Sequence, residues 1–107
     1  MLSQRGYLLD PSSARVAVLD VTRIGDLFSG TICLDATPPE LEHLFQEFEE
    51  MVEGQVFEVA DEIEEKIGRL RLRVAFANGP ETEVSDLQVY PSTKRVSFGI
   101  RQPATVR

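Results

Sequence analysis

The chain has 107 residues, of which 42% are hydrophobic, and this size and composition fit one globular domain. Eighteen acidic against eleven basic residues give a net charge of −7. This balance argues against a general nucleic-acid binder, because neutralising phosphates needs an excess of Lys and Arg. Cys33 is the only cysteine, which excludes an intrachain disulfide and a cysteine-cluster zinc site. No apolar run is long enough to span a membrane, and residues 1–10 lack an export signal. We therefore expect one cytoplasmic domain over residues 1–107, without a membrane partner.

Alternating apolar and polar residues predict two strands in the first third of the chain, over residues 15–22 and 26–34. Residues 23–26, Arg-Ile-Gly-Asp, are typical of a hairpin connection between them. Residues 7–9 have the character of a short additional strand at the edge of the sheet.

The centre of the chain carries the only long helical pattern, in which apolar residues recur at spacings of three and four. These residues are Leu41, Leu44, Phe45, Phe48, Val52, Val56, Val59, Ile63 and Ile67. Thr37 is expected to cap the start of the helix, with Glu40 completing a capping box, and Gly68 is expected to end it in a left-handed conformation.

The predicted helix, residues 38–67, is too long for its domain. It would measure about 45 Å at 1.5 Å per residue, whereas a domain of this size is roughly 35 Å across. Gly54 lies near its middle, so we expect a bend or break there. On an unbroken helix, Phe57 would lie in the middle of the acidic face, opposite Val59.

Three further strands are predicted after the helix, over residues 69–77, 84–90 and 95–101, with turns at residues 78–80 and 91–94. The order β-β-α-β-β-β predicts an α+β fold with two layers. In this fold a largely antiparallel sheet of about five strands is covered on one face by one long or bent amphipathic helix. We expect a loose tail from about residue 102.

Acidic residues are concentrated in the centre of the chain, where residues 35–66 hold twelve carboxylates and one lysine. Several of them repel each other at i,i+4 spacing, so the acidic face does not stabilise the helix as a whole. One interpretation is a solvated face that confers solubility. The other is a surface that recognises a basic protein, for which the partner-binding candidates are Glu49, Glu50, Glu53, Phe57 and Asp61.

Arginines alternate with apolar residues over residues 69–77, which places Arg69, Arg71 and Arg73 on the sheet face opposite the helix. They complete the set of partner-binding candidates. Cross-strand ion pairs with glutamates of the following strand are the alternative interpretation.

The side chains needed for catalysis are scarce, because His43 is the only histidine and Cys33 lies in an ordinary strand. Glu40 and His43 have the Glu-x-x-His spacing of di-iron proteins, but those proteins use the motif twice within a four-helix bundle. We therefore expect no enzyme, no metal and no cofactor.

The sequence thus predicts a small acidic interaction protein that binds a basic protein through its helix, for example an inhibitor or an immunity-type protein that masks a toxin. One alternative is a homodimeric structural protein, in which the long helix and Phe57 form subunit contacts. The other is a nucleic-acid module that uses Arg69, Arg71 and Arg73, although the low aromatic content makes nucleic acid a poorly supported partner.

Overall fold

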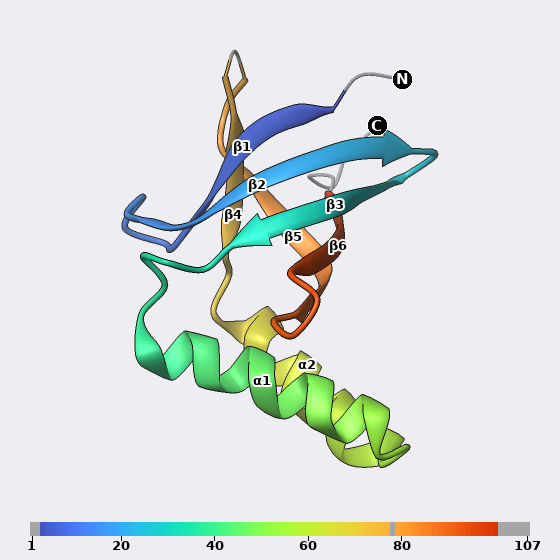
Figure 1. Cartoon of the computed structure of the whole chain (residues 1–107). Helices are drawn as coiled ribbons and strands as arrows, with labels where there is room; N and C mark the ends of the chain where they lie inside the picture. Colours follow the sequence, from blue (N-terminus) through green and yellow to red (C-terminus); the bar gives the residue numbers. More distant parts are fainter. Residues whose placement is uncertain (1–2, 78, 101–107) are drawn as a thin grey trace, which may run out of the picture.

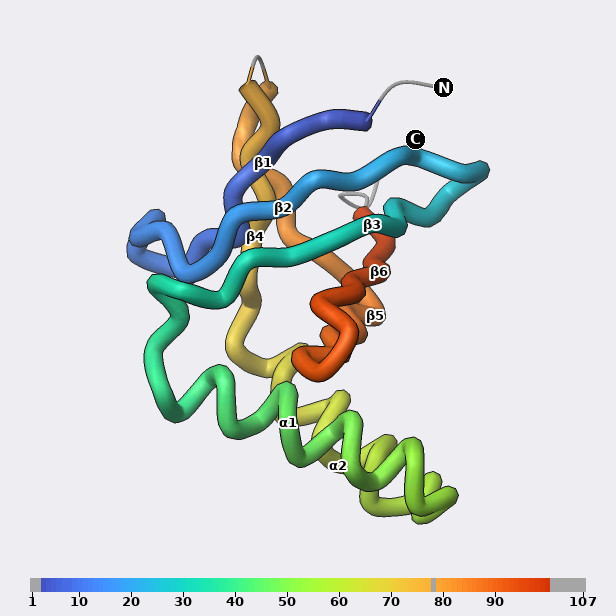
Figure 2. Tube along the Cα trace, in the orientation of Figure 1, coloured from blue at the N-terminus to red at the C-terminus, as the bar shows by residue number. Residues whose placement is uncertain are grey.

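Six antiparallel strands close into a barrel in the computed structural model, which describes residues 3–77 and 79–100 (Figure 1). The elements follow in the order β1 (Gln4–Leu9), β2 (Arg15–Ile24), β3 (Leu27–Cys33), α1 (Pro39–Glu53), α2 (Phe57–Arg69), β4 (Arg73–Phe76), β5 (Thr82–Tyr90) and β6 (Arg95–Ile100). Around the barrel the strand order is β1-β2-β3-β6-β5-β4, and β4 pairs with β1 to complete it. The two helices form a hairpin that lies across one end of the barrel (Figure 2).

The prediction of a two-layer α+β fold is wrong, because the first strand does not lie at an edge of the sheet. β1 pairs with β2 on one side and with β4 on the other, with Gly6 opposite Phe76 and Leu9 opposite Arg73. The sheet therefore curls until its first and last strands meet, which removes its free edges. The fold is a β-barrel with two short helices.

The expected break near Gly54 is present, and it divides the predicted long helix into α1 and α2. Gln55 adopts a left-handed conformation with φ of 60°, which reverses the direction of the chain. The reversal also changes which side chains face inward. Ala60, Ile63 and Ile67 are buried in α2, whereas Val56 and Val59, predicted to face the core, are exposed.

The predicted ends of the helical region are also wrong. Pro38, not Thr37, occupies the N-cap position of α1, and it provides no side-chain cap. The Thr37 hydroxyl donates to the backbone carbonyl of Val16 instead. α2 runs past Gly68 to Arg69, and the left-handed residue is Arg71, with φ of 53°. The predicted strand over residues 69–77 therefore begins only at Arg73.

The core lies inside the barrel and continues under the helices as one cluster of apolar side chains. Phe28 stacks on Phe98 and Phe76 with ring centroids 5.2 and 5.4 Å apart, respectively. Phe45 of α1 is completely buried and belongs to the same cluster. The helical hairpin is thus fixed to the barrel along its apolar face, and its other faces are exposed to solvent.

The predicted hairpins β2–β3 and β5–β6 are confirmed. The first turns at Gly25, with φ of 64°, and the second turns over residues 91–94, where Lys94 has φ of 57°. The predicted turn at residues 78–80 falls partly outside the described residues, as does the end of the strand predicted over residues 95–101. The predicted loose tail from about residue 102 lies wholly outside them.

Candidate protein-binding surface

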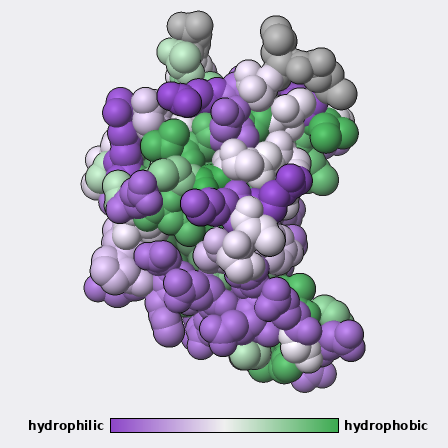
Figure 3. All heavy atoms as spheres, in the orientation of Figure 1, coloured by the Kyte–Doolittle hydropathy of each residue, from purple (hydrophilic) through white to green (hydrophobic). Residues whose placement is uncertain are grey.

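The net negative charge of the described residues is located on the helical hairpin. α1 and α2 hold eleven carboxylates and two basic side chains, whereas the rest of the described chain holds seven acidic and seven basic residues. In Figure 3 hydrophilic side chains accordingly cover much of the visible face of the helices. Within the described residues, a barrel without net charge therefore carries a strongly acidic helical hairpin.

Glu49, the first predicted partner-binding residue, is buried and holds α1 against the barrel. Its carboxylate accepts hydrogen bonds from the backbone N–H of Ser92, at 3.0 Å, and from the Ser92 hydroxyl. Only 7% of Glu49 is exposed. Its carboxylate thus serves as a link between α1 and the β5–β6 turn.

Glu50 and Glu53, in contrast, are exposed along α1. They line a groove of about 610 Å³ between α1 and the β5–β6 turn. Glu42 and Asp35 add two carboxylates to this groove, and Lys94 is its basic residue. A groove of this composition favours cationic groups.

The free end of the hairpin carries three exposed apolar side chains, Val56, Phe57 and Val59, which we call the apolar tip. Their exposed fractions are 43%, 58% and 38%, and Figure 3 shows hydrophobic surface at this end of the helices. On the continuous helix predicted from the sequence, Phe57 was a single apolar residue within the acidic face. After the turn at Gln55, the two valines that one continuous helix would have buried are exposed at the same end of the hairpin.

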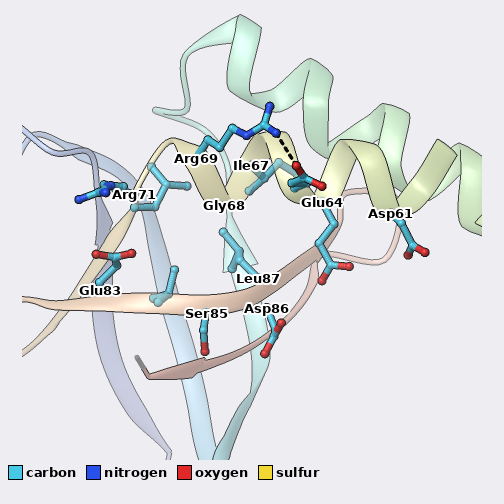
Figure 4. A pocket seen from close by; sticks show the side chains of 13 residues that line it. Asp61, Glu64, Ile67, Gly68, Arg69, Arg71, Glu83, Ser85, Asp86 and Leu87 are labelled. Carbon is cyan, nitrogen blue, oxygen red and sulfur yellow. Dashed lines mark hydrogen bonds and ion pairs between the residues drawn. The ribbon is translucent and has the colours of Figure 1, made fainter. Parts of the chain in front are cut away.

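A second groove, of about 530 Å³, lies between the exposed sides of α2 and β5 (Figure 4). Its apolar lining residues are Ile67, Leu72, Val84 and Leu87. Five carboxylates line it as well, namely Asp61, Glu64 and Glu65 from α2 and Glu83 and Asp86 from β5. Asp86 has φ of 52° at a bulge in β5, where the register with β6 shifts. The predicted candidate Asp61 thus contributes to a mainly acidic groove.

The three predicted arginines do not form one stripe on a strand, so that part of the prediction is wrong. Arg69 is the last residue of α2 and forms an ion pair with Glu65. Arg71 lies in the connection and lines the α2–β5 groove, and Arg73 of β4 pairs with Glu81 at 3.5 Å. The arginines are spread over three segments because α2 continues beyond its predicted end.

A chain of polar contacts beside the hairpin was not predicted from the sequence. The Tyr90 hydroxyl donates to the side-chain oxygen of Gln88 at 3.1 Å, and the Gln88 amide donates to Glu64 at 3.4 Å. Burial raises the pKa of Tyr90, and the nearby charges of Glu64 and Glu49 raise it further. These contacts join α2 to β5, and because they depend on the tertiary structure, no local sequence signal indicates them.

Cys33 and His43 are both exposed. Cys33 lies in β3 and His43 in α1. Among residues 3–77 and 79–100, no three His, Cys, Asp or Glu side chains are arranged to hold a metal ion. Within the same residues, neither helix has the length and apolar character needed to cross a membrane.

Comparison of the chain with protein-family models, with curated proteins and with solved structures found no match. The charge distribution and the exposed side chains of the hairpin are therefore the basis for a functional proposal.

Proposed function

We propose that this protein is a non-enzymatic binding module that recognises a basic protein through the exposed carboxylates of the α1–α2 hairpin. The observation that carries the proposal is the location of the charge: the hairpin holds eleven carboxylates against two basic residues, while the described barrel is balanced. A charge concentrated on one element attracts an oppositely charged partner from a distance and raises the rate of association.

The acidic surface costs the hairpin stability, which supports a role in binding. Glu58 and Glu62 repel each other at i,i+4 spacing, as do Asp61 and Glu65, and each such pair costs about 0.2–0.5 kcal/mol. Both side chains of the Arg69–Glu65 ion pair are exposed to solvent, so this pair offsets little of the cost. A cationic partner would remove the repulsion on binding.

A specific version of this proposal is an inhibitor or immunity-type protein that acts in the cytoplasm and covers the basic site of a toxin or nuclease. The hairpin lies at one end of the closed barrel, a position that suits contact with such a site (Figure 1). The exposed contact residues in this version are Glu50, Glu53, Phe57 and Asp61, with Glu49 in a structural role.

The two alternatives have less support. A symmetric dimer built on the hairpin would bring two acidic surfaces together. A nucleic-acid interface would need free cations on one surface, whereas Arg69 and Arg73 each pair with a glutamate.

Affinity capture with matched charge variants tests the proposed function. Glu50→Lys combined with Glu53→Lys should remove basic partners that the unchanged protein captures at low salt. The control is Asp20→Lys combined with Asp26→Lys, which makes the same change in net charge on the barrel, where both residues are exposed. Equal loss of partners in both double variants, or no loss in either, would refute recognition by the hairpin.

A further inference from the structure

We infer that the apolar tip anchors the interface: Phe57, with its chain neighbour Val56, packs against an apolar segment of the partner whose flanks carry lysine or arginine. This inference rests on the proposed function and deepens it. The carboxylates attract the partner, and the apolar tip supplies the contact that holds it in place.

The exposure of the apolar tip is the first observation. Phe57 leaves 58% of its surface in solvent, and Val56 and Val59, within two residues of it in the chain, leave 43% and 38%. A cluster of exposed apolar side chains surrounded by charge is typical of an interaction site. Aromatic side chains within such patches are frequent energetic anchors of interfaces.

The backbone of the apolar tip is held in place before any partner binds. Hydrogen bonds run from the N–H of Gly54 to the carbonyl of Glu50 at 2.9 Å and from the N–H of Val56 to the carbonyl of Met51 at 2.8 Å. The N–H of Ala60 then donates to the carbonyl of Val56 at 3.0 Å. A preformed contact surface loses less conformational entropy on binding.

The charges around the apolar tip define the chemistry of its occupant. Its neighbours in the chain include four exposed carboxylates, those of Glu53, Glu58, Asp61 and Glu62. Lys66 and Arg69, the two basic residues of the hairpin, are near the opposite end of α2. A second copy docked symmetrically would face this acidic rim with its own, and an anionic membrane would be repelled by it. A partner segment with cationic flanks is the complementary occupant.

A second exposed apolar site provides an internal control. Ile24 and Leu27 flank the β2–β3 turn and are 60% and 54% exposed. This turn lies away from the helices (Figure 1), and Arg23 lies beside it, with its guanidinium 5.8 Å from the Phe28 ring. A partner that recognised exposed apolar side chains without regard to charge would bind the apolar tip and the β2–β3 turn equally.

Peptide titration followed by amide NMR tests the inference with defined probes. The first probe is a short amphipathic peptide of leucine and lysine, the second replaces its leucines with serine, and the third replaces its lysines with glutamate. The leucine–lysine peptide should shift the amide signals of residues 56–61 most strongly. Phe57→Ala should weaken its binding about tenfold, the scale of losing an anchor residue, and Leu27→Ala should leave binding unchanged.

The other outcomes separate the two proposals. If the serine–lysine peptide binds as tightly as the leucine–lysine peptide, and Phe57→Ala has no effect, the anchor is refuted and acidic recognition stands. If no lysine peptide binds, both proposals fail. Binding of the leucine–glutamate peptide, shifts centred on the β2–β3 turn, self-association through residues 56–59, or equal binding to anionic vesicles would each overturn the assigned occupant.

Discussion

Gly30 lies where β3 comes closest to the neighbouring backbone of β2. A Cβ atom on Gly30 would lie 2.1 Å from the carbonyl oxygen of Asp20 and 2.8 Å from the Cα of Val21. Because both obstructing atoms belong to the backbone, they cannot move aside as the end of a flexible side chain could. A side chain at this position would have to separate two paired strands.

We therefore expect Gly30→Ala to lower the free energy of unfolding by about 1–3 kcal/mol, the usual range for overpacking. Gly68→Ala is the matched control, since no atom lies within 4 Å of its added Cβ. It should raise the free energy of unfolding by up to about 1 kcal/mol, because alanine favours a helix over glycine. Urea denaturation of both variants measures the difference, and a neutral Gly30→Ala would contradict the close approach.

Asp10 organises the turn between β1 and β2, and its pKa should lie below the ordinary value of an aspartate. The Ser12 hydroxyl donates to its carboxylate at 2.6 Å, and the backbone N–H groups of Ala14 and Ser12 donate at 3.0 and 2.9 Å. These hydrogen bonds, that of the Ser12 hydroxyl first, lower the pKa of Asp10 below 3.8. Because the pKa is lower in the folded state, ionised Asp10 stabilises the fold above its ordinary pKa, and this contribution disappears as the pH falls through the folded value.

Carboxyl-detected NMR titration of Asp10 measures this pKa directly. Ser12→Ala should raise it toward the ordinary value, because the largest favourable interaction with the ionised form is lost. An unchanged pKa in Ser12→Ala would show that the hydroxyl does not hold the carboxylate.

At the scale of elements, Glu49 contributes a polar link between α1 and the barrel in addition to the apolar contacts. Glu49→Ala leaves the N–H and hydroxyl of Ser92 without their acceptor. We expect a loss of about 1–3 kcal/mol in the free energy of unfolding, the cost of breaking a partly buried charged hydrogen bond. Glu50→Ala, one residue along the same helix and exposed, should change it by less than about 0.5 kcal/mol. Equal effects in thermal or chemical denaturation would rule out the link.

Local patterns predicted the elements that depend on neighbouring residues. The alternation in β2, β3, β5 and β6 and the turn at Gly25 all agree with the structure. The division of the helix near Gly54 was anticipated from its length. The change of phase in α2 was not, because it depends on the left-handed conformation of Gln55, a residue type that does not signal φ above zero.

The candidate site was predictable only in its charge. The acidic composition of the hairpin can be read from the sequence, and Glu50, Glu53, Phe57 and Asp61 are all exposed. The buried role of Glu49 depends on Ser92, a residue 43 positions away. Val56 and Val59 are exposed at the same end of the hairpin as Phe57 because the chain reverses between the helices.

At the scale of the whole molecule, local sequence patterns could not predict that the barrel closes. It requires β1 to pair with β4, so that Leu8 lies opposite Val74 across more than half of the chain. Periodicity reports which side of a strand is buried but not which strand lies beside it. Residues 7–9 therefore indicated only an edge strand.

Hydrogen exchange should show that the helical hairpin opens before the barrel. β2 and β3 are each paired on both sides, whereas the helices pack mainly on β5 and carry repelling carboxylates. Amides of α1 and α2 should therefore exchange faster than those of β2 and β3.

Added salt should slow exchange in the helices more than in the barrel, because it screens repulsion between exposed charges. Equal protection of helices and strands, or a uniform response to salt, would contradict a hairpin of lower stability.

The separation of charge between hairpin and barrel has a consequence for colloidal behaviour. Free molecules repel one another through the helices, since the described barrel contributes no net charge. A cationic partner that covers the hairpin removes that mutual repulsion. Occupied molecules should therefore migrate more slowly toward the anode in native electrophoresis and reach their solubility limit at lower concentration, so that precipitation itself becomes a measure of occupancy.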